Sequence, residues 1–180
     1  MRSSAKPSPG SGFPPSRRRS MHRLDLKTGA LAEWRPGATV VDLAEGRAPL
    51  PVEGDGPLVL RIGADALDED VAGFVERAIC IEIVARDFKD GRVASLVRHL
   101  RRHYRYGSEI VVSGPVIPQM ADFLRRVGAD AVLLADPDRA GHWCEALKTP
   151  QVWLQFAADA RPTVLELRHR RSRRGEREEA

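Results

Sequence analysis

Cysteine is scarce in this chain of 180 residues, because only Cys80 and Cys144 are present, and they lie far apart without a CxxC or other metal-type spacing. A disulfide-stapled scaffold is therefore excluded, and two isolated thiols are typical of a reducing cytoplasm. No apolar run approaches the roughly 18 residues that a membrane span needs. The arginines and prolines at the N-terminus are not followed by the apolar core of a secretory signal. We therefore expect a cytoplasmic protein that does not enter the membrane.

Sequence motifs for bound cofactors and metals are also missing. No GxxxxGK[ST] loop occurs, and Gly10-Ser11-Gly12 lacks the rest of a dinucleotide-binding fingerprint. His99 and His103 have the i, i+4 spacing of zinc-binding helices. However, no glutamate follows the first histidine, and the sequence shows no third ligand. We therefore predict neither a cofactor nor a metal site.

Positive charge is concentrated at the two ends of the chain. The formal net charge is +4, but residues 1–20 carry five basic groups without an acid, and residues 161–180 carry seven arginines and four glutamates. Residues 21–160 are therefore mildly acidic. A nucleic-acid-binding domain carries its basic excess on the fold, so we expect nucleic acid to bind only weakly and only through the tails. The composition predicts disordered tails at 1–20 and 161–180 around a single domain at 21–160.

Short apolar runs alternate with helical patterns from residue 57 onward. Strands are expected at 58–62, 80–84, 110–112 and 131–134, with further short ones at 39–43 and 152–156, and helices at 68–78, 92–105, 117–127 and 139–147. This alternation predicts an α/β fold with a mostly parallel sheet built from about four βα units. The sheet is expected to be open or half-barrel-like.

The segment Asp90-Gly91-Arg92 lies where the helix at 92–105 is expected to begin. In an open parallel sheet, ligands bind outside the carboxyl ends of the strands, and this segment follows such an end. Asp90 can accept a hydrogen bond from a backbone N–H two or three residues on, which leaves free N–H groups and Arg92 for an anion. The plainer alternative, in which Asp90 only caps the helix and Arg92 only pairs with an acid, stays open.

The same helix carries a basic face. Its arginines are Arg98, Arg101, Arg102 and Arg105. This face is either a surface for an anion or an acidic partner, or an ordinary solvated helix face.

The chain resembles a bacterial family, the domain of unknown function 934. The motif is Asp87-Phe88-Lys89-Asp90-Gly91-Arg92, followed by Ser95, Arg98, Leu100, Arg101 and Tyr104, and then by Glu109, Gly114, Val116, Gln119 and residues 126–130. The resemblance covers about residues 57–147. Two positions depart from the family pattern, because Ala94 replaces a usual aromatic residue and Pro118 replaces a usual acid.

The resemblance implies an accessory role in assimilatory sulfate or sulfite reduction. A sulfite or adenylylsulfate reductase is then the expected partner, and a small oxyanion the expected ligand. The candidate binding residues are Asp90, Gly91, Arg92, Ser95, Arg98, Gly114 and Gln119.

Two alternatives remain open. The first is a small oxidoreductase-type enzyme of sulfite reduction, in which Asp90 and either Asp136 or Asp138 are the available acid–base groups. The second is a module that binds polyanions through its tails.

Overall fold

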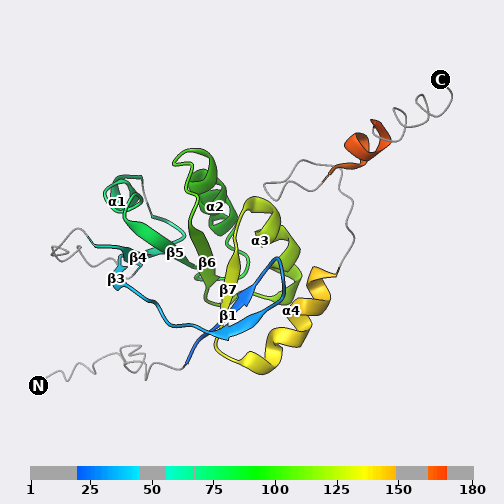
Figure 1. The fold of residues 1–180 in the computed structure, drawn as a ribbon, viewed down its shortest axis with the longest axis horizontal. Coiled ribbons are helices and arrows are strands. Elements are labelled where there is room, and N and C mark those ends of the chain that lie inside the picture. The colour runs from blue at the N-terminus through cyan, green and yellow to red at the C-terminus, as the bar shows by residue number, and fades with distance from the viewer. Residues whose placement is uncertain (1–19, 45–55, 67, 149–161, 170–180) are drawn as a thin grey trace, which may run out of the picture.

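The computed structural model describes residues 20–44, 56–66, 68–148 and 162–169. Within them it contains a seven-stranded sheet packed against helices, shown in Figure 1. The strands are β1 (His22–Asp25), β2 (Leu31–Glu33), β3 (Thr39–Asp42), β4 (Leu58–Gly63), β5 (Ala78–Val84), β6 (Glu109–Ser113) and β7 (Ala131–Leu134). The helices are α1 (Asp68–Ala72), α2 (Arg92–Arg102), α3 (Ala121–Val127) and α4 (Ala140–Leu147), and the short 3₁₀ turns η1 (Pro118–Met120) and η2 (Pro137–Arg139) precede α3 and α4.

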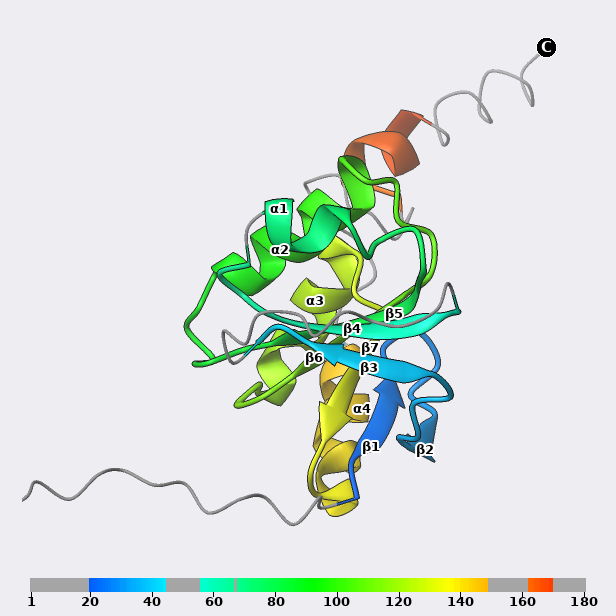
Figure 2. The same cartoon turned by 90° about the vertical axis from the view of Figure 1, so that its left-hand side faces the viewer.

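Strands β3 to β7 are parallel and lie side by side in chain order. The full order is β2-β1-β7-β6-β5-β4-β3, with β1 antiparallel to both β7 and β2. The prediction of an α/β fold with a mostly parallel, open sheet is therefore confirmed. Each parallel strand is added on the same side of the strand that precedes it in the chain. Because the crossover connections are right-handed, their helices all lie on one face of the sheet. Figure 2 shows α1, α2 and α3 over the same side of the sheet.

The main core lies between the helices and this covered face. Leu60, Ile81 and Ile110 point into it from the strands, and Leu100 and Trp143 meet them from α2 and α4. A smaller cluster lies on the opposite face, formed by Val59, Cys80, Val111, Ala131 and Leu133 beneath Met21, Trp34 and Ala38. Burial raises the pKa of the Cys80 thiol, and the nearby Glu109 and Glu82 raise it further, so Cys80 packs as a small apolar group.

A polar row crosses the face opposite the helices near the carboxyl ends of the strands. Arg61 joins Asp42 at 2.6 Å and Glu82 at 3.2 Å, and Ser113 donates to Glu82 at 2.5 Å. These bonds link β3, β4, β5 and β6, and each charged group in the row has a partner of opposite charge. The row therefore stabilises the order of the strands.

Two of the helices are shorter than their sequence patterns predict. The helix expected at 68–78 is regular only over Asp68–Ala72, and turns continue from Gly73, where glycine weakens a helix. The helix expected at 92–105 ends at Arg102, and the chain reverses at Arg105, whose φ is 50°. This reversal buries Tyr106, whose hydroxyl donates to the Ala78 carbonyl at 2.9 Å. Tertiary contact thus ends the helix before its pattern does.

The region after the expected N-terminal tail differs most from the expectation. No strand was expected at β1 or β2, which form a hairpin on the edge beyond β7. The turn between them is held by Asp25, which accepts from the N–H groups of Lys27 and Thr28 at 2.9 and 2.8 Å. The strand expected at 152–156 and most of both expected tails lie outside the described residues. None of the helices within the described ranges has the length and apolar character needed to cross a bilayer.

Arg101 on α2 anchors the amino-terminal ends of β6 and β7. It donates to the carbonyls of Gly128 at 2.9 Å, Tyr106 at 2.6 Å and Ser108 at 2.7 Å, and it pairs with Asp130. The predicted basic face of this helix is therefore wrong for Arg101, which is only 18% exposed. Arg98 and Arg102 are exposed, as expected for that face.

We expect Arg101→Met to lower the free energy of unfolding by about 2–3 kcal/mol, because three carbonyls and one carboxylate lose a charged donor. The aliphatic stem is kept, so the loss reports on the hydrogen bonds. Arg102→Met is the matched control on the same helix, and this exposed change is expected to cost less than about 0.5 kcal/mol. Urea unfolding of the two variants measures the difference, and equal midpoints would contradict the role given to Arg101.

Candidate functional site

The loops that follow the parallel strands meet at one edge of the sheet. Asp65 follows β4, Arg86 follows β5, Gly114 follows β6 and Asp136 follows β7. Arg86 and Asp65 are joined by an ion pair of 3.3 Å, which links the first two loops. This edge is where an open parallel sheet binds its ligands.

Asp90 and Arg92 are paired with each other at the start of α2. The Asp90 carboxylate accepts from the Arg92 backbone N–H at 3.1 Å, the contact expected two residues on, although the N-cap of α2 is Gly91 and no side chain caps it. It also accepts from the Arg92 guanidinium at 2.8 and 2.7 Å. The side-chain hydrogen bond from Arg92 lowers the pKa of Asp90. The geometry thus corresponds to the plainer alternative, with Arg92 paired to an acid, although its side chain remains 59% exposed.

The other candidate residues are brought together only in part. Ser95 lies one turn into α2, with its hydroxyl 3.5 Å from the Gly91 carbonyl. Arg98 is exposed further along the helix, and Gln119 is exposed on η1. Neither side chain has a hydrogen-bond or ion-pair partner among the residues that the structure describes. The structure therefore groups Asp90, Gly91, Arg92 and Ser95, and shows no contact of Arg98 or Gln119 with them.

The backbone conformation at this edge requires glycine at position 114. Its φ is +99°, and a Cβ placed there would lie 2.2 Å from the Ala85 carbonyl oxygen. Only glycine fits such a conformation and such a close approach. The turn after β6 can therefore pass directly against the residue that follows β5, which brings two loops of the edge together.

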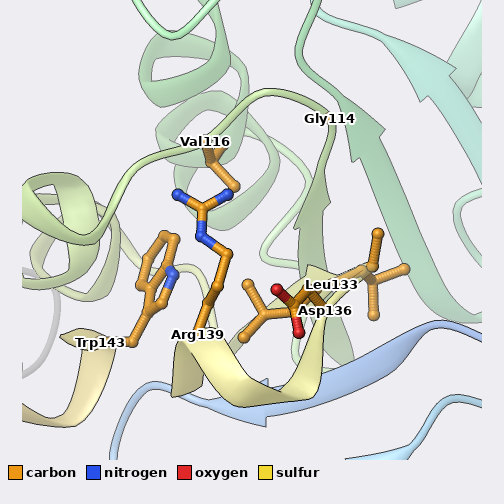
Figure 3. A pocket seen from close by; sticks show the side chains of 8 residues that line it. Gly114, Val116, Leu133, Asp136, Arg139 and Trp143 are labelled. Carbon is orange, nitrogen blue, oxygen red and sulfur yellow. The ribbon is translucent and has the colours of Figure 1, made fainter. Parts of the chain in front are cut away.

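A small pocket opens beside Gly114, between the ends of β6 and β7. Its volume is about 110 Å³, and it is lined by Gly114, Val116, Leu133, Leu134, Ala135, Asp136, Arg139 and Trp143. Figure 3 shows the Arg139 side chain beside the indole of Trp143, with its guanidinium directed toward Val116. The Asp136 carboxylate accepts from the Asp138 N–H at 3.0 Å and so caps η2.

Arg139 differs from the other arginines at this edge because its guanidinium has no hydrogen-bond or ion-pair partner within the described ranges. Sequence analysis places Arg139 in a loop at the carboxyl edge but does not single it out as a binding residue, because no neighbouring residue shows that it faces a pocket. A cation without a partner beside a buried aromatic wall suits a small anion. The pocket is smaller than the roughly 300–1,000 Å³ of clefts that hold drug-sized ligands, so it fits a ligand of few atoms.

Gly114→Ala is expected to destabilise the protein by more than about 2 kcal/mol, because a side chain at positive φ is strained and its Cβ clashes with backbone. Gly91→Ala is the matched control, since its φ is −63° and nothing lies within 4 Å of an added Cβ. That change is expected to be neutral or stabilising by up to about 1 kcal/mol. Chemical denaturation measures both, and similar losses in the two variants would contradict the close approach at Gly114.

Comparison with known proteins identifies a family and nothing beyond it. Neither the curated proteins nor the solved structures contain a match to the chain. A family model does match residues 59–165, from within β4 to beyond α4. The match therefore includes the pocket and the Asp90–Arg92 pair, and it agrees with the resemblance seen in the sequence. The chain belongs to the family described as bacterial protein of unknown function (DUF934).

Proposed function

We propose that this protein is an accessory protein of assimilatory sulfate or sulfite reduction that binds a small oxyanion in the pocket between β6 and β7. The observation that carries the oxyanion site is the Arg139 guanidinium, which has no partner among the described residues and lines that pocket. The sulfur context rests on the family resemblance of the sequence motif around Asp90, Gly91 and Arg92. Sulfite and sulfate are both small enough for a pocket of about 110 Å³.

Arg139 is the better anion ligand because Arg92 is already engaged. An anion at Arg92 has to compete with the two guanidinium hydrogen bonds to Asp90. An anion at Arg139 displaces no protein partner, so a larger part of the charge-assisted interaction contributes to binding. The proposal therefore shifts the binding centre from the start of α2 to the start of α4.

A reductase partner suits the outer face of α2. Arg98 and Arg102 are exposed there, and neither has a partner among the residues described. Exposed arginines favour contact with an acidic surface, mainly by speeding association. In this arrangement the accessory protein holds a small oxyanion at one edge of its sheet while the helix face meets the enzyme.

Calorimetric titration with sulfite and with sulfate tests the pocket. Arg139→Gln is expected to weaken binding by about tenfold or more, since a charged hydrogen bond is lost. Arg102→Gln, an exposed arginine elsewhere, is expected to bind like the wild type. If Arg92→Gln abolishes binding while Arg139→Gln does not, the anion binds at α2 instead. If the wild type binds neither anion, the oxyanion site is wrong.

Co-purification tests the partner. The protein is expected to retain a sulfite or adenylylsulfate reductase, and the charge-reversed variant Arg98→Glu, Arg102→Glu is expected to retain less because it repels an acidic surface. Arg139→Gln is the control that leaves this face intact. Failure of both reductases to bind the wild type would contradict the accessory role without bearing on the pocket.

A further inference from the structure

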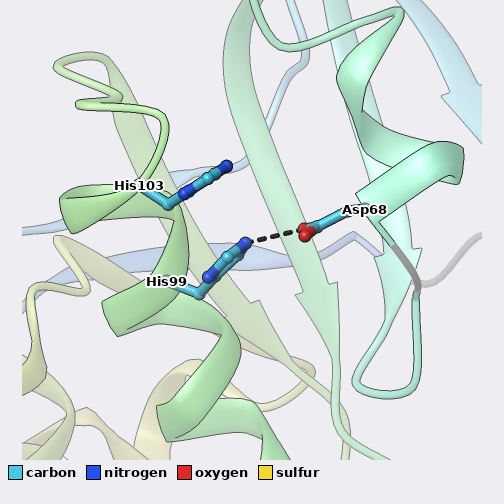
Figure 4. A group of neighbouring side chains, drawn as sticks. All are labelled: Asp68, His99 and His103. Carbon is cyan, nitrogen blue, oxygen red and sulfur yellow. Dashed lines mark hydrogen bonds and ion pairs between the residues drawn. The ribbon is translucent and has the colours of Figure 1, made fainter.

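Asp68, His99 and His103 form a cluster at the outer side of α1 and α2. Their ligand atoms all lie within 4.8 Å of one another, and His99 Nε2 is 2.6 Å from Asp68 Oδ1. The two imidazole rings are stacked, with centroids 4.8 Å apart and planes inclined by 12°. Figure 4 shows both rings projecting from one side of α2 toward Asp68.

Asp68, the third member of the cluster, could not be identified from the sequence. Residues four positions apart lie on the same face of a helix, so His99 and His103 are neighbours by spacing alone. Asp68 comes 31 residues before His99, and it joins them only because α1 lies beside α2 in the fold. The prediction of no metal site rested on two absences, a glutamate after His99 and a third ligand, and the structure supplies a candidate for the third ligand.

Two imidazoles and one carboxylate form a donor set with a definite preference. Imidazole nitrogen suits zinc, iron, nickel and copper, whereas magnesium and calcium prefer sets made of oxygen alone. Three protein ligands also leave a coordination position open to water. We propose that Asp68, His99 and His103 bind a divalent transition-metal ion.

The geometry needs only small side-chain movements to close around an ion. Metal–ligand bonds of about 2.0–2.2 Å at tetrahedral angles place the donor atoms about 3.3–3.6 Å apart. His99 Nε2 and Asp68 Oδ1, now 2.6 Å apart, separate slightly on binding, and the more widely spaced donor atoms, all within 4.8 Å of one another, approach. The side chains of Asp68 and His99 are 62% and 37% exposed, and His103 is exposed as well, so they can rotate without disturbing the core. An ion can therefore enter from solvent.

Tyr104 contacts all three members of the cluster. Its hydroxyl lies 3.3 Å from the Asp68 carbonyl oxygen and 3.4 Å from Oδ1, close enough to donate to either. Its ring meets both imidazoles edge-on, with centroids 5.6 and 5.0 Å away. Groups that fix the orientation of metal ligands in this way raise metal affinity.

An ion pair between His99 and Asp68 explains part of the cluster but gives no role to His103. His103 has ring contacts and no side-chain hydrogen bond within the described part of the chain. The residues next to the cluster in sequence carry both charges: Arg98 and Arg102 precede the two histidines on α2 and disfavour a cation, whereas Glu69 follows Asp68 on α1 and favours one. His103 therefore distinguishes a metal site from a simple pair.

Titration of the full-length, tag-free protein with Zn²⁺ tests the proposal, with Co²⁺ absorption as a second probe. One ion per chain is expected, and His103→Ala and Asp68→Asn are each expected to weaken binding by more than about tenfold, since losing a direct ligand exceeds losing a group that only orients one. His142→Ala removes an exposed histidine of α4 and is the matched control. It is expected to bind Zn²⁺ like the wild type.

Thermal unfolding gives an independent readout. Zn²⁺ bound between α1 and α2 is expected to raise the melting temperature of the wild type but not that of His103→Ala. Equal Zn²⁺ affinity in the wild type, His103→Ala and His142→Ala would overturn the proposal, as would the absence of binding to the wild type. Arg139→Gln is expected to bind Zn²⁺ normally, so failure of this site and failure of the oxyanion pocket are distinguishable.

Discussion

The ion pair between Arg101 and Asp130 holds together the end of the sheet opposite the pocket. Arg101 donates hydrogen bonds to carbonyls in the segment after α2 and at the end of α3. Asp130 accepts from the Ile110 N–H and from the Lys27 ammonium group. The helix α2, the strands β6 and β7 and the β1–β2 hairpin therefore converge on one pair of side chains. Because these contacts hold the amino-terminal ends of β6 and β7, the register of the two strands is fixed. The loops at their carboxyl ends are positioned as a result.

The order of the strands explains where the pocket lies. Parallel strands that follow one another without reversal have no crevice of the kind that opens where strand order reverses. β7 is the last of them, and its other neighbour β1 is antiparallel, so in the described residues no further βα loop covers the edge beyond β7. The start of α4 fills that position and brings Arg139 and Trp143 to the pocket.

The sequence predicted the features that depend on neighbouring residues. Runs such as Ala131–Leu134 are apolar throughout because both faces of a central parallel strand are buried. Gly128 ends α3 with a φ of +112°, as its position after the helical pattern predicts. The hydrogen bond from the Arg92 N–H to the Asp90 carboxylate spans only two residues, so it can also be predicted from local sequence.

What the sequence could not predict depends on distant residues. Arg101 looked like one more cation on a basic face, since its partners Gly128 and Asp130 become neighbours only when α2 packs beside the turn after α3. Arg139 looked like an ordinary loop residue, because nothing local shows which arginines lack acidic partners. Asp68 joins His99 and His103 only through the packing of α1 on α2. Side-chain roles set by tertiary contact are invisible to patterns of period two or 3.6.

A crystal structure of the protein with selenate is the most direct test of the proposed oxyanion site beside Arg139, because anomalous scattering from selenium locates the ion without reference to any variant. We expect selenium between the Arg139 guanidinium and the turn at Gly114–Val116. Selenium at Arg92 with the Asp90 pair broken, or a pocket without selenium, would contradict it.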